Sequence, residues 1–389
     1  MAREIAAAGT PPPSARDAFD VPDGVVYLNC ASIAPRLKRV TAAGHAAVDR
    51  MAAPWNIHTP DWFRDARALA SAFARLIAAP AQCAALVPSV SYGIAAAARN
   101  LPLRAGENIV VIDQEYPSNY YSWRRLADAN GAEIRSVRPA GNASLTDAIV
   151  TAIDRRTAVV AVAHCRWTDG CLVDLPRVGE AARRHGAALV VDASQSLGAC
   201  PLNVGDFQPD FLVSVGYKWL LGPYGLGYLY VAERWHAQGE PLEESWLHRA
   251  GSDNFASLVD YTPDYQPGAA RFGQGESAQF YLVPMALEAL SQIAEWTPEH
   301  IHRQLRAWTD ELVARAEPWG FTGPGRSQRA GHMVGLSSER GLRPDLARAF
   351  AERGVYVGIR GSCIRVAPHL HTPLDAMDRL IEALQTIAV

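Results

Sequence analysis

The residue most suited to covalent chemistry in this chain is Lys218. Of the 37 lysines and arginines only two are lysines, Lys38 and Lys218. Lys38 lies among charged neighbours, which is typical of a solvated surface, whereas Lys218 lies in the apolar, glycine-bearing run 214–223. Arginine stays protonated in proteins, but a desolvated lysine can lose its proton and attack a carbonyl group. The sequence therefore predicts that the amine of Lys218 is a nucleophile.

Asp192 and Gln195 form a second candidate group. Asp192 ends the apolar run 187–191, which we interpret as a buried strand, and ligands bind beyond the carboxyl ends of such strands in open α/β sheets. An acid at this place can also be a helix cap. Gln195 follows three residues later and carries no signal of its own.

A third group combines a phosphate loop and an aromatic residue. Residues 88–93, which include Ser91, lie between a predicted strand and an Ala-rich helix. Amides at a helix start bind phosphate, although serines there are also explained by simple capping. Tyr116 follows the strand predicted over 108–112, where it could stack on a flat ring or simply pack. The sequence has no Walker A lysine and no Gly-x-Gly-x-x-Gly after the first strand, so ATP and NAD are weaker candidates as ligands.

Together these groups fit pyridoxal 5'-phosphate (PLP), whose ring nitrogen needs an anion beside it to stay protonated. Their order resembles the class V aminotransferase family of fold-type I PLP enzymes. That family includes cysteine desulfurases, kynureninases and isopenicillin N epimerase-like proteins, and residues 192–195 and 216–223 carry the resemblance most specifically. It implies that Lys218 holds PLP as a Schiff base, that Asp192 pairs with the ring nitrogen and that Gln195 bonds the phenolate oxygen.

The resemblance also implies further contacts to the cofactor and to the substrate. Phosphate contacts come from the Val90 amide, Ser91 and Tyr217, and Tyr116 takes the ring-stacking position. The other residues that it implies are Thr168 in a loop beside the cofactor, Ser277 in a segment that reaches the partner subunit, and Asn29, Ala31 and Arg365 at the substrate. Arg365 matches the arginine that binds the substrate carboxylate, a role for which a guanidinium is well shaped.

Departures from the family pattern bear on the reaction. Val215 stands where desulfurases usually carry serine, and Glu276-Ser277 stands where the partner-subunit motif usually has threonine. Desulfurases also carry a reactive cysteine on a mobile loop between the positions of Arg360 and Arg365. Only four residues intervene here, so Cys363 is expected on a strand and unable to carry a persulfide.

The elements that must position these residues alternate between strand and helix from about 25 to 232. Strands are predicted over 25–28, 84–87, 108–112, 134–137, 158–163, 187–191, 211–215 and 226–231. Helices are predicted over 62–78, 94–99, 121–130 and 175–185, then over 282–295, 299–316 and 345–353. Short strands at 355–359 and 364–367 and a last helix capped by Thr372 follow.

This pattern predicts an α/β fold that the resemblance makes aspartate aminotransferase-like. We expect a large domain over 21–265 with a mostly parallel, seven-stranded-type sheet, and a smaller α+β domain over 266–389. Residues 1–20 are expected to form a mobile tail, and the first segment after it is expected to pack on the small domain.

Bulk properties limit the partners. The net charge of −3 does not favour nucleic acid or an anionic membrane, and no apolar run is long enough to cross a bilayer. Six scattered cysteines without a Cys-x-x-Cys pair predict reduced thiols, no metal site and a cytoplasmic location. The resemblance further implies a homodimer with active sites at the interface.

The expected substrate is a small molecule, an amino acid of unspecified identity, and the expected chemistry removes its Cα proton through an external aldimine with PLP. We favour an aminotransferase-type reaction. A Cβ or C–S lyase and an epimerase use the same residues and remain alternatives. A non-catalytic PLP-binding regulator is a further alternative from another class, although the short N-terminus offers no DNA-binding module.

Overall fold

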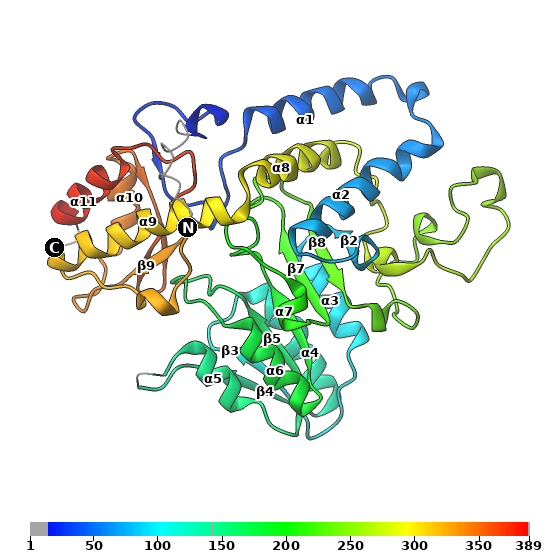
Figure 1. Ribbon diagram of the computed structural model, residues 1–389, viewed down its shortest axis with the longest axis horizontal. Helices are drawn as coiled ribbons and strands as arrows, with labels where there is room; N and C mark the ends of the chain where they lie inside the picture. Colours follow the sequence, from blue (N-terminus) through cyan, green and yellow to red (C-terminus); the bar gives the residue numbers. More distant parts are fainter. Residues whose placement is uncertain (1–14, 142, 388–389) are drawn as a thin grey trace, which may run out of the picture.

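The computed structural model describes residues 15–141 and 143–387 (Figure 1). Its strands are β1 (Val26–Tyr27), β2 (Ala84–Val87), β3 (Asn108–Ile112), β4 (Glu133–Val137), β5 (Thr157–Ala163), β6 (Ala188–Asp192), β7 (Phe211–Val215), β8 (Gly227–Val231), β9 (Val334–Leu336), β10 (Val355–Tyr356), β11 (Gly358–Arg360) and β12 (Cys363–Val366). Its α-helices are α1 (Lys38–Met51), α2 (Arg64–Leu76), α3 (Val90–Asn100), α4 (Tyr121–Asn130), α5 (Leu145–Ala152), α6 (Leu175–His185), α7 (Val204–Phe207), α8 (Leu282–Trp296), α9 (Pro298–Ala316), α10 (Leu346–Ala351) and α11 (Ala376–Ile387).

A seven-stranded sheet in the order β2-β8-β7-β6-β5-β3-β4 forms the centre of the molecule. β8 is antiparallel to both of its neighbours and the remaining pairs are parallel, which confirms the expected α/β architecture. Helices α2, α5, α6 and α8 pack on one face, and α3 and α4 on the other. In β6, Leu189 and Val191 face one layer and Val190 faces the other. Burial on both faces explains why these strands are continuous apolar runs.

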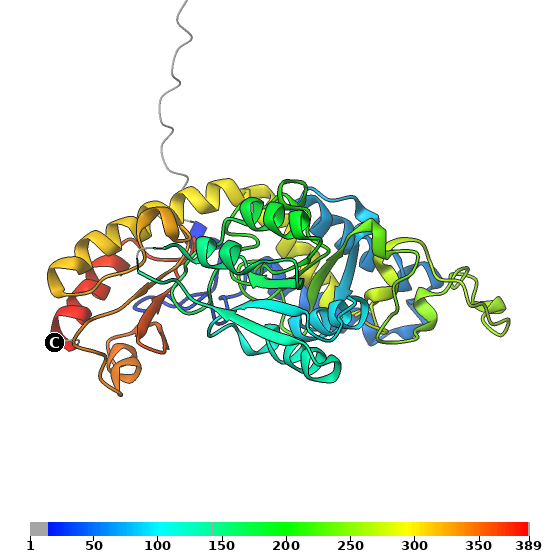
Figure 2. The same ribbon diagram turned by 90° about the horizontal axis from the view of Figure 1, so that it is seen from below.

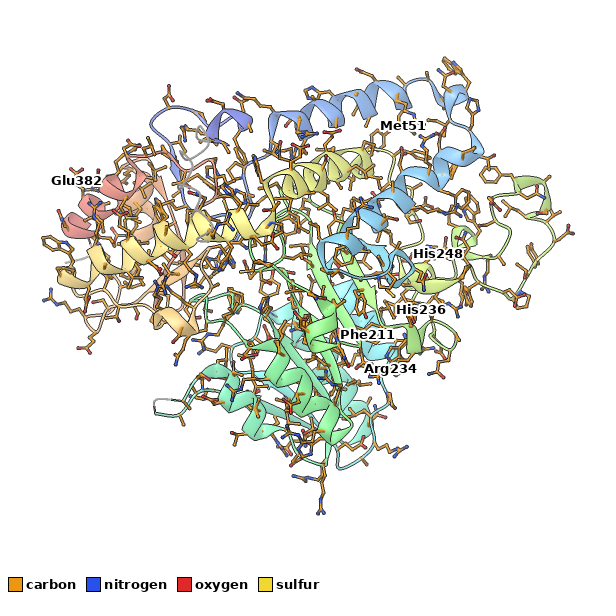
Figure 3. The ribbon with its side chains drawn as sticks, viewed as in Figure 1. Met51, Phe211, Arg234, His236, His248 and Glu382 are labelled. Carbon is orange, nitrogen blue, oxygen red and sulfur yellow. The ribbon has the colours of Figure 1, made fainter. Side chains whose placement is uncertain are left out.

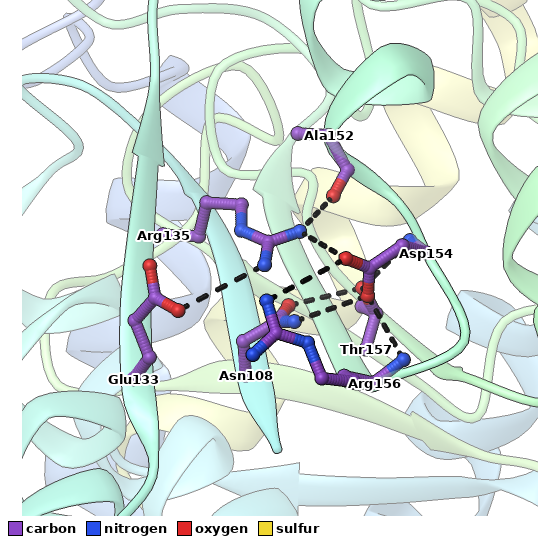
Figure 4. A network of polar contacts seen from close by, with 7 residues as sticks. All are labelled: Asn108, Glu133, Arg135, Ala152, Asp154, Arg156 and Thr157. Carbon is purple, nitrogen blue, oxygen red and sulfur yellow. Dashed lines mark hydrogen bonds and ion pairs between the residues drawn. The ribbon is translucent and has the colours of Figure 1, made fainter. Parts of the chain in front are cut away.

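A polar network joins the amino ends of β3, β4 and β5 (Figure 4). Nη1 of Arg135 donates to the carbonyl of Ala152 at 2.6 Å and to Oδ2 of Asp154 at 3.0 Å. Oγ1 of Thr157 donates to Oδ1 of Asn108 at 2.9 Å. These bonds satisfy buried polar groups at one edge of the sheet and leave the loops at the opposite, carboxyl edge available for a ligand.

The C-terminal part contains a three-stranded antiparallel sheet, in the order β11-β12-β9. The strand predicted over 355–359 is interrupted at Val357, because β10 pairs with β1 while β11 pairs with β12. The last helix begins at Ala376, later than predicted. Thr372 does not cap it: its hydroxyl accepts from the amide of His369 at 3.2 Å and so stabilises the preceding turn.

The N-terminal segment packs on this C-terminal part through the β1–β10 pair. Of the expected mobile tail, residues 1–14 lie outside the described residues. Residues 15–20 include a 3-10 helix (Ala15–Ala18), and Phe19 is buried, with its ring 6.0 Å from that of Trp296 and 5.3 Å from that of His371. This end of the segment is therefore held by packing.

Figure 2 shows the two parts of the molecule side by side along its long axis. The C-terminal part has its own apolar core, and a mixed cluster joins both parts through residues such as Cys30, Trp219 and Met285. Helix α8 follows residue 265 but packs on α1 and α2 and against the large sheet. The division at residue 265 remains a prediction. Among the described residues, no helix combines the length and the apolar character needed to cross a lipid bilayer.

Candidate active site

Lys218 follows β7 in a tight loop that two glycines close. The amide of Gly222 donates to the carbonyl of Gly216 at 2.8 Å, and the amide of Gly216 donates to the carbonyl of Leu226 at 3.0 Å. A Cβ on Gly216 would lie 2.9 Å from the Leu226 carbonyl oxygen, which is too close for any other residue. The glycine-bearing motif therefore holds Lys218 at the carboxyl edge of the sheet.

The amine of Lys218 is buried beside two aromatic rings. The residue is 6% exposed, and its Nζ lies 5.3 Å from the ring centre of Tyr116 and 5.8 Å from that of Tyr217. Burial lowers the pKa of Lys218 to about 8, against the attraction of Asp192, and the charges of Arg365 and Arg360 add to the lowering. A substantial neutral fraction near pH 8 makes this amine a nucleophile and a base.

Asp192 ends β6 and lies in the same cavity, of about 220 Å³, as Lys218. One carboxylate oxygen, Oδ1, accepts from the amide of Ser194 at 2.9 Å. Burial raises the pKa of Asp192, while the hydrogen bonds from Ser194 and the charge of Lys218 oppose the rise. A buried carboxylate of this kind is stabilised by a cation, and the ring nitrogen of a bound pyridinium would supply one.

The amino end of α3 forms another wall of this cavity. The hydroxyl of Ser89 accepts from the amide of Tyr92 at 3.1 Å and so caps the helix, as the simpler interpretation predicts. The hydroxyl of Ser91 lies 2.8 Å from that of Ser89, and Val90 and Ser91 both line the cavity. The first amides of a helix have no acceptor within it, so capping and phosphate binding are compatible here.

Tyr116 lies between the cofactor side and the substrate side of the site. Its ring meets that of Trp167 edge-on, with 5.5 Å between centres. Glu115 fixes the loop beneath it, because this carboxylate accepts from the amides of Tyr116 at 2.7 Å and Ala163 at 3.1 Å. Burial and the nearby charge of Asp192 raise the pKa of Glu115 to about 8. We did not include Glu115 among the expected site residues, although an acid so soon after a buried strand was a usable signal.

Gln195 is held by residues from three other segments. Its Nε2 donates to the carbonyl of Ala31 at 2.9 Å, and its Oε1 accepts from Nε1 of Trp219 at 3.0 Å. Nε2 of His332 contacts the backbone carbonyl of Gln195. Trp219 and His332 were not expected to orient the site. Only the position of Trp219, directly after Lys218, hinted at such a role.

A second cavity, of about 330 Å³, adjoins the first and contains Arg365. Arg365 is 1% exposed, and its guanidinium donates to the carbonyl of Trp167 at 2.9 Å and to Oδ1 of Asn29 at 3.3 Å. Its Nε is buried without a hydrogen-bond partner in the described chain. Burial, together with the charge of Arg360, lowers the pKa of Arg365 to about 9. The Arg365 guanidinium is therefore a buried cation that an anionic ligand would stabilise.

The two cavities are adjacent, because Tyr116, Gln195 and Lys218 line both. Ala31 lines the second cavity, while Asn29 reaches it only through its contact with Arg365. The remaining two expected residues lie elsewhere. Thr168 lines neither cavity, and Ser277 lines a separate cavity together with His248 and residues of the edge strand β2. Figure 3 labels His248 beside this edge of the sheet.

The family model described as Aminotransferase class-V matches residues 26–374. The chain belongs to this family. It is 28% identical over 342 residues to isopenicillin N epimerase of Streptomyces clavuligerus, covering 81% of this chain and 82% of that protein. It is 27% identical over 403 residues to kynureninase of Burkholderia mallei, covering 96% and 92%. A solved structure of a C-DES mutant with glycine covalently linked to its PLP cofactor is 17% identical, with a TM-score of 0.82 over 96% and 99% of the two chains.

PLP is accordingly the cofactor, and the residues of the first cavity fit it. A buried amine, a buried carboxylate and a helix amino end with two serines face one enclosed space. Lys218 would hold the aldehyde carbon, Asp192 the ring nitrogen, and Val90 and Ser91 the phosphate. These individual contacts are part of our proposal below.

Cys363 lies on a hairpin rather than on a mobile loop. It pairs with Arg360 across β11 and β12, and only Gly361 and Ser362 form the turn. Burial raises the pKa of its thiol, which disfavours the reactive thiolate. That the protein is not a cysteine desulfurase remains a prediction.

Cys200 forms a polar cluster behind Gln195. Its Sγ lies 3.3 Å from Nδ1 of His302 and 3.2 Å from Nδ1 of His332, and these three atoms could hold a metal ion. Cysteine spacing could not reveal ligands that come from distant segments. Nε2 of His332 must donate to the Gln195 carbonyl, and Nε2 of His302 accepts from Arg306 at 3.3 Å. A thiol between the two imidazoles therefore already satisfies the cluster, and the expected absence of a metal remains a prediction.

Proposed function

We propose that this PLP-dependent enzyme acts on an α-amino acid in an aminotransferase-type reaction. The observation that carries the proposal is a pair of adjacent cavities that share Lys218 in their lining, with Asp192 in the first and Arg365 in the second. Among the described residues, Arg365 forms no ion pair and its Nε has no hydrogen-bond partner. An amine-binding lysine beside a carboxylate-binding arginine matches the two charged ends of an amino acid.

Arg365 binds the α-carboxylate of the substrate in this proposal. Its guanidinium fork can donate two parallel hydrogen bonds, and the contacts with Trp167 and Asn29 fix its orientation in advance. This fixes the direction of the Cα–H bond relative to the cofactor ring. Ala31, whose carbonyl accepts from Gln195, lines the entrance beside it.

Lys218 moves the proton. When bound, PLP supplies the electron sink for the pair released at Cα. Lys218, once the substrate amine has displaced it, would accept the Cα proton and would deliver it to C4′, the former aldehyde carbon of PLP, rather than to another carbon of the substrate. Its lowered pKa suits this exchange near neutral pH. Asp192 and Gln195 would hold the ring nitrogen and the phenolate oxygen, and Tyr116 would stack on the ring. The Val90 amide, Ser91 and Tyr217 would hold the phosphate. Thr168 is a cofactor contact only by the resemblance, because it lines neither cavity.

Two experiments test the cofactor assignment and the catalytic role. Borohydride reduction followed by peptide mapping should place the pyridoxyl group on Lys218. A label on Lys38, or no label, would refute the assignment. Amino acids should shift the visible absorbance of the holoprotein. A yellow protein whose spectrum responds to no amino acid would favour a non-catalytic PLP-binding protein.

Elimination at Cβ and epimerisation at Cα require the same residues, and epimerase and kynureninase relatives favour keeping both as alternatives. A screen of amino acids for keto acid, sulfide, alanine and racemised product separates the three outcomes. Keto acid formation with transfer of the amino group supports the aminotransferase-type reaction. Sulfide or alanine alone would replace it with a lyase reaction, and racemised product alone would replace it with epimerisation.

We further propose a homodimer in which Ser277 reaches the partner's cofactor. The segment that precedes Ser277 projects from the body of the molecule (Figures 1 and 2), and it exposes apolar residues, with Tyr261 96% and Val259 78% exposed. Such exposure is typical of an interface rather than of a free surface. A cytoplasmic location also belongs to the proposal, supported by six cysteines that are all free thiols.

A further inference from the structure

The substrate-side cavity contains a second arginine, Arg360, besides Arg365. In the hairpin, Gly358 lies opposite Arg365, and Arg360 lies two residues beyond Gly358 on the same strand. Side chains repeat every two residues along a strand, so Arg360 and Arg365 are diagonal neighbours on one face. Both residues line the cavity that also contains Lys218.

The hairpin makes room for these two large side chains. Gly358 has no side chain, and a Cβ there would lie 2.9 Å from Oδ1 of Asn29 and 3.4 Å from Nε of Arg365. The space above Gly358 is thus filled by the guanidinium of Arg365. Arg360 lies on the same face at the turn end of the hairpin, because the turn that begins at Gly361 follows it directly.

The charges in this cavity are not balanced. Among the residues that the structure describes, its lining includes three cations, Lys218, Arg360 and Arg365, and no acidic residue. Within residues 15–141 and 143–387, neither arginine forms an ion pair, whereas nearby Arg166 pairs with Asp169. The lowered pKa values of Lys218 and Arg365 both include repulsion from Arg360. Because Lys218 holds the cofactor in the proposed function, a single α-carboxylate would leave one of the two arginines without an anionic partner.

The side chain of Arg360 is held only loosely. Its Nη1 donates to the carbonyl of Ile359, next to it in the chain, at 2.8 Å. Its guanidinium carbon lies 5.9 Å from the ring centre of Trp167. A half-buried guanidinium with one local hydrogen bond keeps most of its five donors for a ligand.

We propose that the substrate is an amino acid whose side chain carries a second acidic group, and that Arg360 binds this group while Arg365 binds the α-carboxylate. The inference rests on the proposed function and specifies its substrate class. Carboxylate and sulfinate side chains share the chemistry that a guanidinium recognises. Acidity of the side chain, rather than its length, is what the second arginine selects.

Absorbance titration of the holoenzyme tests the proposal through binding alone. The ligands are L-aspartate, L-glutamate, L-2-aminoadipate and L-cysteine sulfinate, with L-asparagine and L-glutamine as uncharged counterparts of the first two. At least one acid should bind about 10- to 150-fold more tightly than the amides, as expected for one charge-assisted pair. Arg360→Gln should remove this preference and leave the affinity for the amides within about threefold.

Arg340→Gln is the matched control, because Arg340 lies in an exposed turn outside both cavities. It should leave all affinities unchanged. Equal binding of acids and amides by the wild-type enzyme would overturn the proposal, as would a preference that survives Arg360→Gln. A spectrum that no amino acid shifts would instead refute the proposed function itself, so the two failures are distinguishable.

Discussion

Replacing Lys218 by methionine should stabilise the apoprotein at neutral pH, although it destroys the cofactor link. The pKa of Lys218 is about 8 in the folded protein and 10.5 in the unfolded chain, so the buried ammonium costs about 3 kcal/mol at pH 7. Methionine has a similar length and no charge. We therefore expect the free energy of unfolding of the Lys218→Met apoprotein to exceed that of the wild type by up to about 3 kcal/mol.

The sign of the pH dependence follows from the same shift. Between pH 8 and 10.5 the unfolded chain keeps the Lys218 proton that the folded chain has lost, so the stability of the wild-type apoprotein rises with pH over this window. The advantage of the variant should therefore be full below pH 8 and almost absent by pH 10.5. Urea unfolding at pH 7, 9 and 10.5, after removal of PLP with hydroxylamine, measures the difference.

Lys38→Met is a matched control, because Lys38 is exposed at the start of α1 and is the only other lysine. It should change the stability by less than about 0.5 kcal/mol at every pH. A Lys218→Met apoprotein that is less stable than the wild type at pH 7, or whose advantage does not shrink toward pH 10.5, would refute the reasoning that burial, with the charges of Arg365 and Arg360, depresses the pKa of Lys218.

Four further predictions address the site and its assembly. Arg365→Ala should keep the cofactor spectrum but lower kcat/KM about 10- to 150-fold. Arg365→Lys should recover little activity, because the point charge of an ammonium lacks the two parallel donors of a guanidinium. A wild-type kcat/KM in the alanine variant would show that the role of Arg365 is structural. Cys363→Ser should leave the main activity within a few-fold, and turnover of cysteine to alanine that vanishes in this variant would contradict us. Dialysis against EDTA should leave the activity and the melting temperature unchanged. A loss of either would contradict the expected absence of a metal and would make Cys200 with His302 and His332 the candidate site. Sedimentation should show a dimer, whose obligate interface we expect to bury on the order of 2,000 Å² or more. A monomer that stays fully active on dilution would exclude shared active sites.

Most of the large sheet could be read from the sequence, because its strands are buried on both faces and appear as short apolar runs between turn residues. Helices α1 and α5 were not predicted. α1 buries only Val40 and Ala47 fully, and its many alanines give little contrast between its faces. Strand β9 was also missed, since three residues with glycine in the middle carry no periodicity of their own.

Several site residues were predictable one by one, because each departs from what its local sequence requires. Lys218 is one of only two lysines in a chain whose other basic residues are arginine or histidine, and Asp192 is an acid at the end of an apolar strand. Glu115 and Arg360 stood beside recognised motifs but were not assigned a role. Their significance depends on neighbours that are distant in the chain, such as Ala163 for Glu115 and Lys218 for Arg360.

The sequence by itself determined the strand and helix alternation, the reactive lysine and the resemblance to PLP enzymes, because these depend on residue types and on spacing within a few dozen positions. Only the tertiary structure decided which charges share a cavity. Residues from β6, the loop after β7 and β12 come together at one edge of the sheet, and β1 pairs with a strand more than 300 residues away. Burial there lowers the pKa of Lys218, and among the described residues the two arginines of the second cavity have no acidic partner. Both effects depend on which distant segments the fold brings together, and no local pattern encodes this.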